Sequence, residues 1–131
     1  MLLDKLTEPV SFIRSQSQIK PKIGIILGSG LGSFVQHVQV DAQIPFNKIP
    51  HFMSTSVEGH QGNLILGTLG THSIVILQGR LHYYEGHSIS RIGLPIRVMQ
   101  RLGIEVVILT NAAGGLNPDY SAGDLMVITD H

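Results

Sequence analysis

The stretch IGIILGSGLG at residues 23–32 decides the fold. Its first five residues are apolar on both faces, which indicates a short strand buried inside a sheet. The glycines of GSGLG at 28–32 then allow a tight turn, and we expect a short helix to follow toward His37. A buried strand that passes through a glycine-rich turn into a helix is typical of an α/β fold.

The rest of the chain predicts several more strands and few helices. Apolar side chains recur at helical spacing over residues 2–16 and 88–102, and Pro95 inside the second segment is expected to kink it. Further strands are expected over 39–44, over 63–69 and 72–77 as a hairpin, over 105–109 as a buried strand, and over 125–128. We therefore predict an α/β fold with a mixed β-sheet flanked by helices.

The composition excludes several classes of protein. Nine basic and nine acidic residues give no net charge, which argues against binding to nucleic acid or to a membrane surface. The absence of cysteine excludes disulfides and thiolate zinc sites. No apolar run approaches the roughly 20 residues of a membrane span, and acidic residues interrupt the N-terminal segment, unlike a signal peptide. We expect a cytoplasmic protein without a membrane or nucleic-acid partner.

Two features indicate that these residues are part of a larger fold. Apolar residues make up 43% of the chain and charged residues only 14%, so more surface than usual is expected to be buried against other protein. Beyond the first helix, one convincing helix is available to cover a sheet whose apolar strands need cover on both faces. We therefore expect residues 1–131 to be the N-terminal part of a single α/β domain that is truncated.

The GSGLG turn suits an anion. Successive backbone N–H groups can converge on a ligand there, a helix N-terminus adds a favourable dipole, and Ser29 offers a hydroxyl. A P-loop would need four residues between its glycines and then Lys-Ser/Thr, and a dinucleotide fingerprint needs its third glycine one residue later. The turn therefore predicts an anion loop of another type, with a plain strand-to-helix turn as the alternative.

A second polar cluster, GRLHYYEG at 79–86, follows the strand expected at 72–77. If this segment stays extended, side-chain alternation places Arg80, His82 and Tyr84 on one face. An arginine fork matches phosphate oxygens, a neighbouring histidine can donate to the same anion, and a tyrosine suits a sugar hydroxyl. The segment favours a ligand site over a solvated surface.

Two further segments are ambiguous by themselves. TNAAGGLN at 110–117 follows an apolar strand, where ligands of open α/β sheets bind, and a plain turn is the alternative. EGHQG at 58–62 places His60 in a long loop, where a lone histidine is usually a surface residue. His82 and His87 are five positions apart and no histidine pair has convincing ligand spacing, so we predict no metal site.

Four motifs stand in the order and approximate spacing of one known family: GSGLG (28–32), STSVEGHQG (54–62), GRLHYYEG (79–86) and TNAAGGLN (110–117). With them the chain resembles the trimeric purine nucleoside phosphorylases, from about residue 23 to residue 131. Methylthioadenosine phosphorylases of the same superfamily carry differently worded motifs and are a distant second. One departure is Met53, where the family often has proline.

The resemblance implies reversible phosphorolysis of purine ribo- and deoxyribonucleosides to the free base and a pentose 1-phosphate. Inorganic phosphate would be a substrate, and no cofactor is implied. The implied phosphate site consists of Ser29, His60, Arg80, Leu81 through its main chain, His82 and Ala112, with His82 as the catalytic residue. Tyr84 would meet the nucleoside at its ribose, and Glu85 and Asn111 would position their neighbours.

The resemblance also implies what these residues lack. The family's chains are longer, and their later half supplies the groups that bind the purine, so hypoxanthine and guanine are the default bases with xanthine or adenine as alternatives. A homotrimer is implied for the full-length protein. The alternative is a truncated, catalytically inactive chain that retains only phosphate binding or association, and we expect no turnover from the 131 residues alone.

Overall fold

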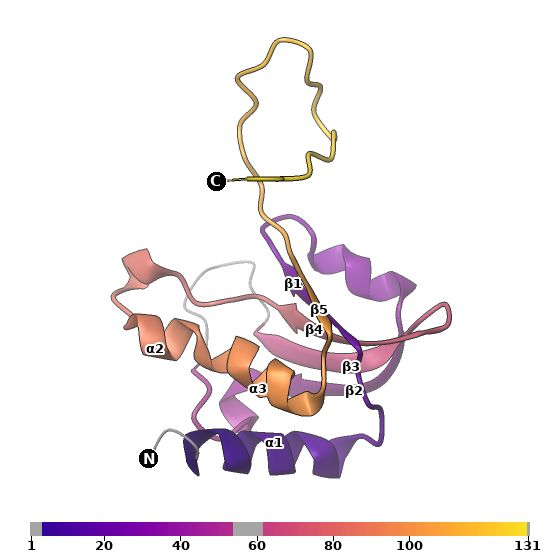
Figure 1. Ribbon diagram of the computed structural model, residues 1–131, viewed down its shortest axis with the longest axis vertical. Helices are drawn as coiled ribbons and strands as arrows, with labels where there is room; N and C mark the ends of the chain where they lie inside the picture. Colours follow the sequence, from indigo (N-terminus) through magenta and orange to yellow (C-terminus); the bar gives the residue numbers. More distant parts are fainter. Residues whose placement is uncertain (1–3, 54–61, 131) are drawn as a thin grey trace.

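A computed structural model describes residues 4–53 and 62–130, which form a five-stranded sheet with helices packed on it (Figure 1). The elements follow in this order: helix α1 (Asp4–Gln16), strand β1 (Ile23–Leu27), 3₁₀-helix η1 (Gly32–His37), strand β2 (Gln39–Pro45), 3₁₀-helix η2 (Phe46–Lys48), strands β3 (Asn63–Leu69) and β4 (His72–Gln78), 3₁₀-helix η3 (Tyr83–Glu85), helices α2 (Ile89–Ile92) and α3 (Leu94–Leu102), and strand β5 (Val106–Leu109). The mixed α/β fold predicted from the sequence is confirmed.

The sheet has the strand order β2-β3-β4-β1-β5 and contains both kinds of pairing. Strand β3 is antiparallel to β2 and β4, and the tight turn between β3 and β4 uses Gly70 at a φ of 59°. Strand β1 lies in the middle of the parallel part, with Ile25 opposite Ile76 of β4 and Ile108 of β5. The carboxyl ends of β1, β4 and β5 therefore lie at the same edge of the sheet.

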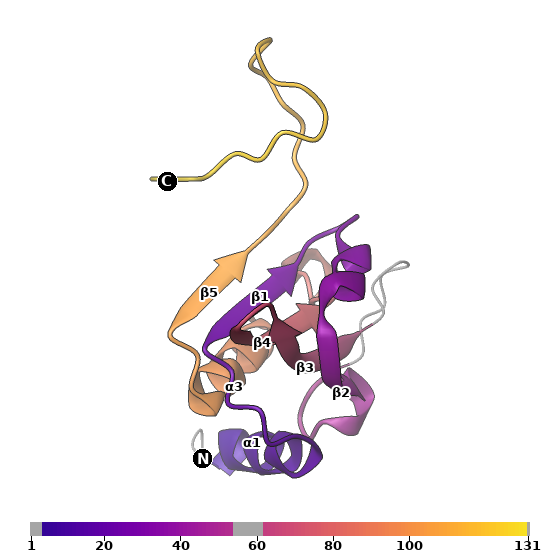
Figure 2. The same cartoon turned by 90° about the vertical axis from the view of Figure 1, so that its right-hand side faces the viewer.

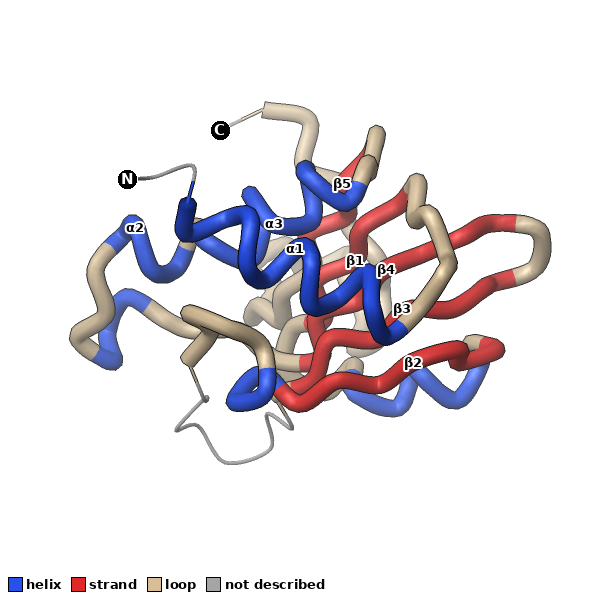
Figure 3. The backbone as a smooth tube through the Cα atoms, turned by 90° about the horizontal axis from the view of Figure 1, so that it is seen from below, coloured by secondary structure: helices blue, strands red, loops and turns tan. Residues whose placement is uncertain are grey.

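The central strands bury apolar side chains on both faces of the sheet. Side chains alternate along a strand, so Ile26 of β1 enters the cluster under α1 and α3, while Ile25 enters a second cluster on the opposite face. Ile13 of α1 and Met99 of α3 are fully buried in the first cluster, where the two helices lie together over the sheet (Figure 3). Phe34 of η1 packs against the second cluster. Strand β1 is thus buried on both faces, as its composition predicted.

The single helix expected over residues 88–102 is two helices. Helix α2 ends at Ile92 and α3 begins at Leu94, with Gly93 between them. Pro95 explains the break, because proline has no N–H to donate and its ring clashes with the carbonyl group four residues earlier, so it is tolerated only in the first turn of a helix.

None of the helices in the part of the chain that the structure describes has the length and apolar character to cross a lipid bilayer.

Two expectations for the C-terminal part were wrong. The strand expected to be buried at 105–109 is β5, the last strand of the sheet, and its four side chains are between 40% and 64% exposed. Residues 125–128 form no strand, because the chain leaves the sheet after β5 and these residues lie well away from it (Figure 2). A strand needs a neighbour to satisfy its backbone hydrogen bonds, and none of the described residues supplies one to this segment.

Thr110 joins the ends of β1 and β5 at the carboxyl edge. Its hydroxyl accepts a hydrogen bond from the backbone N–H of Gly28 (2.8 Å) and donates one to the carbonyl oxygen of Ile26 (2.8 Å). The Thr110 N–H donates to the same carbonyl (3.2 Å). Threonine suits this place because a hydroxyl both donates and accepts. The turn that follows β1 is thereby tied to the residue that follows β5.

We predict that Thr110→Val lowers the free energy of unfolding by about 1 kcal/mol, because the valine side chain leaves the Gly28 N–H without its acceptor. Urea unfolding followed by circular dichroism measures the change. Thr110→Ser keeps the hydroxyl and is the matched control. Equal stability of the valine and threonine proteins would show that this contact does not stabilise the fold.

Candidate functional site

Three loops meet at the carboxyl edge of the sheet, one after each of the parallel strands β1, β4 and β5. Gly28, after β1, lies so close to the residues after β5 that a Cβ atom on it would be 2.7 Å from the Thr110 carbonyl oxygen and 2.8 Å from the Cα of Asn111. Arg80, after β4, donates from Nη1 to the same Thr110 carbonyl (2.7 Å). Three of the four sequence motifs are thus brought together.

The loop after β1 is a tight turn, as expected, and it leads into a 3₁₀-helix, η1, rather than an α-helix. The Leu31 N–H donates to the Gly28 carbonyl (3.2 Å), and Gly30 has a φ of 83°, which glycine adopts without strain. Ser29 is exposed to solvent, so a ligand can reach its hydroxyl from outside the sheet.

A buried pair of amide side chains lies behind this loop. Gln78, the last residue of β4, donates from Nε2 to the Gly32 carbonyl (3.1 Å) and accepts a hydrogen bond from Asn63 of β3 (3.2 Å). Because both side chains are buried, these bonds satisfy polar groups that have little access to water. Neither Gln78 nor Thr110 was predicted as a residue of this site. The available signal was the same for both, a polar residue directly after a run of four apolar ones.

The segment after β4 is not extended, which corrects the expectation that strand alternation would align its side chains. Residues Tyr83–Glu85 form η3, and the turn stacks the rings of His82 and Tyr84 with their centroids 4.9 Å apart. Arg80 donates instead to the loop after β5, and Leu81 is half-buried. Tyr84 is 76% exposed.

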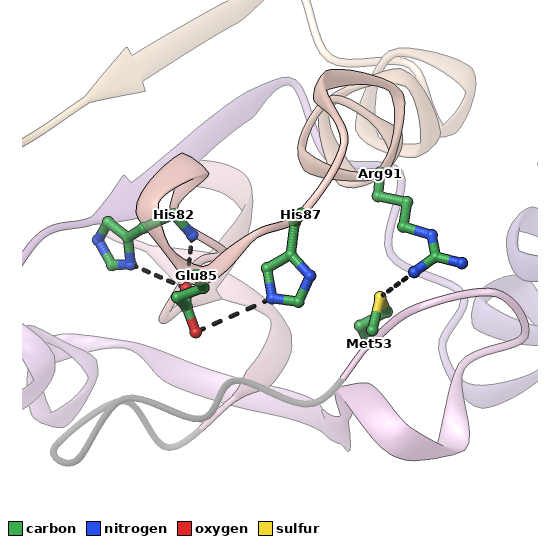
Figure 4. Close-up of polar contacts among 5 residues, drawn as sticks. All are labelled: Met53, His82, Glu85, His87 and Arg91. Atoms are coloured by element: carbon green, nitrogen blue, oxygen red, sulfur yellow. Dashed lines mark hydrogen bonds and ion pairs between the residues drawn. The ribbon is translucent and has the colours of Figure 1, made fainter.

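Glu85 stands between two histidines (Figure 4). Its Oε2 accepts a hydrogen bond from the His82 backbone N–H (2.6 Å) and lies 3.3 Å from Nδ1 of the same residue, while its Oε1 lies 3.9 Å from Nε2 of His87. The three side chains are largely buried, with 6% of Glu85, 17% of His82 and 16% of His87 exposed. A carboxylate so enclosed is costly unless donors surround it. The His82 side chain also accepts a hydrogen bond from the Glu85 backbone N–H, so the two residues cap the turn from both sides.

The other predicted residues lie farther out or outside the described ranges. Asn111 and Ala112 are exposed, and the Asn111 amide donates to the Ala112 carbonyl (3.3 Å). Beyond them the chain projects away from the sheet (Figure 1), so this motif meets Gly28 and Arg80 at its first residues. His60 belongs to residues 54–61, which lie outside the described residues.

An apolar pocket of about 190 Å³ borders Arg80 between the sheet and helices α2 and α3. Its basic side chains are Arg80, Arg91 and His51. The Arg91 guanidinium contacts the Met53 sulfur (3.6 Å; Figure 4), and His51 contacts Glu8 (3.1 Å). Across residues 4–53 and 62–130, no three His, Asp or Glu side chains gather closely enough to hold a metal ion. Arginine and backbone N–H groups beside apolar surface make an anionic ligand the favoured one at this edge.

Comparison with known proteins agrees with this arrangement. The model of the phosphorylase superfamily matches residues 22–131. Purine nucleoside phosphorylase 1 of Bacillus subtilis is 47% identical over 128 residues, which cover 98% of this chain and 47% of that protein. The crystal structure of isoform 2 of the Schistosoma mansoni enzyme, in complex with cytosine and ribose-1-phosphate, is 46% identical with a TM-score of 0.80. A schistosoma purine nucleoside phosphorylase in complex with hypoxanthine is 45% identical with a TM-score of 0.82.

Each of the two structural matches covers 92% of this chain and 42% of the solved chain. The chain therefore spans less than half the length of these relatives. Nevertheless, the region matched by the family model includes all four motifs and every strand of the sheet. Since that match covers most of the residues, and the three loops at the carboxyl edge lie within it, the chain belongs to the phosphorylase superfamily.

Proposed function

We propose that the protein is a purine nucleoside phosphorylase and that this chain carries its phosphate-binding part. The reaction would convert purine ribo- and deoxyribonucleosides and phosphate to the free base and a pentose 1-phosphate. The observation that carries the proposal is the convergence of Gly28, Arg80 and Thr110 at one edge of the sheet. Similarity to a relative of this name, and to solved structures with ribose-1-phosphate and hypoxanthine bound, supports it.

The roles in this proposal follow the motifs. The phosphate site consists of Ser29, His60, Arg80, Leu81 through its main chain, His82 and Ala112. Tyr84 meets the ribose, and Glu85 and Asn111 position their neighbours. Inorganic phosphate is a substrate, and the proposed reaction involves no cofactor.

Arg80 is suited to the central role among these residues. A guanidinium carries five N–H donors, and the bond from Nη1 to the Thr110 carbonyl orients the group while engaging one side of it. Arg80 is half-buried beside an apolar pocket. In such surroundings the effective dielectric is lower than in water, so a charge-assisted hydrogen bond to an anion is stronger.

The proposed reaction explains why anion binding is central. Cleavage of the glycosidic bond builds positive charge on the ribose and negative charge on the departing purine. A phosphate dianion held beneath the sugar stabilises the cation and then forms the new bond to its anomeric carbon. The protein contributes by holding the dianion in place, through positioning and preorganised electrostatics.

The proposal extends to the whole protein. Residues 1–131 are taken as the N-terminal part of a single α/β domain, and the full-length protein as a cytoplasmic homotrimer. Exposed apolar side chains on β5 and over residues 125–128 support burial of this surface against further protein.

Arg80→Ala is expected to weaken phosphate binding by roughly 10- to 100-fold with the fold intact, because a hydrogen bond to a charged group contributes about 1.5–3 kcal/mol. Isothermal titration with inorganic phosphate measures the affinity. Arg97→Ala removes an exposed arginine of α3 and is the matched control. Unchanged phosphate affinity in Arg80→Ala would remove Arg80 from the site.

Gly28→Ala should also weaken phosphate binding, by about tenfold or more, because small displacements of a positioned group carry large costs. The new Cβ would overlap the Thr110 carbonyl, at 2.7 Å, and these are backbone atoms that cannot turn aside. Gly114→Ala is the control, since among the described residues, its chain neighbours aside, no atom lies within 4 Å of the Cβ it would add. If Gly28→Ala binds phosphate as tightly as the unmodified protein, the close approach of the two loops is not needed for the site.

The reaction itself is tested with inosine and the full-length protein, because no turnover is expected from these 131 residues alone. Chromatography should detect hypoxanthine only when phosphate is present, together with ribose 1-phosphate in equal amount. Release of hypoxanthine and free ribose without phosphate would identify a hydrolase and overturn the proposal. Phosphate binding with no turnover would favour the alternative of a chain that retains phosphate binding alone.

A further inference from the structure

We propose that Gln78 is a positioning residue for the turn at residues 28–32: by holding the Gly32 carbonyl oxygen, it fixes where the turn presents Ser29. That this turn binds phosphate rests on the function proposed above, whereas the hydrogen bonds of Gln78 stand on their own geometry. The Gln78 Nε2 donates to the Gly32 carbonyl (3.1 Å), and the Gln78 Oε1 accepts from Nδ2 of Asn63 (3.2 Å).

Pairing of the strands places Gln78 between these two partners. Gln78 ends β4 and lies opposite Leu27, the last residue of β1 before the turn. Across the antiparallel pair it lies opposite Asn63, the first residue of β3. Side chains that are opposite each other on antiparallel strands are close enough to interact. The Gln78 side chain therefore has one partner in β3 and the other at the end of the turn after β1.

Only one orientation of the Gln78 amide fits both partners. A backbone carbonyl oxygen accepts hydrogen bonds and cannot donate them, so the Gln78 atom that faces Gly32 must be the nitrogen. Its oxygen then faces Asn63, whose side-chain nitrogen donates to it. Because Gln78 is 8% exposed and Asn63 is 7% exposed, water competes little for these bonds. The amide is therefore held in this orientation.

The turn is held at both ends by residues that belong to other parts of the sheet. At its start, the Gly28 N–H donates to the Thr110 hydroxyl after β5 (2.8 Å), and at its end the Gly32 carbonyl accepts from Gln78 in β4. Ser29 is exposed between these two points. Fixed ends limit the conformations open to so short a segment, so its hydroxyl keeps a defined place for a ligand.

The bond to Gln78 also controls where a negative partial charge points. An unsatisfied backbone carbonyl oxygen carries such a charge, and one that faced an anion would repel it. Gln78 keeps the Gly32 oxygen directed at β4. Glutamine suits this place because its amide donates and accepts at once, whereas a carboxylate could only accept and would bring its own negative charge.

Gln78→Met in the full-length protein tests this role. Methionine is unbranched and about as long as glutamine, but it has no donor for the Gly32 carbonyl. Hydrogen exchange followed by mass spectrometry, without phosphate, should show faster exchange over residues 28–34, because the turn opens more often once its end is released.

Phosphate binding provides the second readout. Isothermal titration with inorganic phosphate should give about fivefold weaker binding for Gln78→Met, a loss of about 1 kcal/mol. With inosine as the second substrate, the KM for phosphate should rise by a similar factor while the KM for inosine stays unchanged.

Ser17→Ala is the matched control for a general loss of stability. Ser17 is 8% exposed and its hydroxyl donates to Asp41 of β2, so the substitution also removes a largely buried donor. It should leave both the exchange over residues 28–34 and the phosphate affinity unchanged. If Gln78→Met does not fold, Asn63→Ala, which keeps Gln78 but removes the donor to its oxygen, repeats the test with a smaller expected effect.

The two proposals fail in different ways. If Gln78→Met leaves either the exchange over residues 28–34 or the phosphate affinity unchanged, or if Ser17→Ala weakens phosphate binding equally, the positioning role of Gln78 is wrong. If the unmodified full-length protein binds no phosphate, the proposed function is wrong, and the exchange experiment still decides whether Gln78 holds the turn.

Discussion

Parallel pairing of β1 with β4 and β5 is the constraint on which the rest of the structure depends. Strands in a parallel pair run the same way, so the loops that leave their carboxyl ends leave at the same edge of the sheet. Strand β4 comes to this position through an antiparallel hairpin with β3, which places Asn63 beside Gln78 at that edge. One arrangement of backbone hydrogen bonds therefore gathers loops that are about fifty and thirty residues apart in the chain, after Leu27, Gln78 and Leu109.

Contacts between the loops then hold this edge together. Thr110 accepts from Gly28 with its hydroxyl and from Arg80 with its carbonyl oxygen, so a single residue positions a glycine turn and a guanidinium. The close approach needs glycine at position 28, because any side chain there would meet backbone atoms of the neighbouring loop. Behind the turn, the side-chain amide of Gln78 donates a hydrogen bond to the Gly32 carbonyl oxygen. The anion site proposed here is thus part of the same hydrogen-bond arrangement that closes the sheet edge.

Much of this could be predicted from local pattern. Strands β1, β3 and β4 lie close to the positions that their apolar runs predicted. Strands buried on both faces form continuous apolar runs, which can be recognised in a sequence without any polar alternation. A single helix over 88–102 is wrong because Pro95 is tolerated only in the first turn of a helix, so a new helix begins at Leu94. A strand over 125–128 is wrong because the described residues offer this apolar run no strand to pair with. Glycine and arginine motifs located three of the loops. The contacts of Thr110, Gln78 and His87 were not predicted, because each depends on a partner distant in the sequence or on a turn that local spacing does not reveal.

By itself, the sequence determined which segments are apolar on both faces, where glycine permits a turn, and which loops carry an arginine, a serine and a histidine for an anion. These properties depend on residue type and on neighbours within a few positions, so they can be seen without a fold. Only the tertiary structure decided that Gly28, Arg80 and Thr110 meet, that β5 is an exposed end of the sheet, and that Glu85 lies between two histidines. The reason is physical: strand order and the direction of pairing are set by hydrogen bonds between distant segments, and these bonds place the ends of the strands.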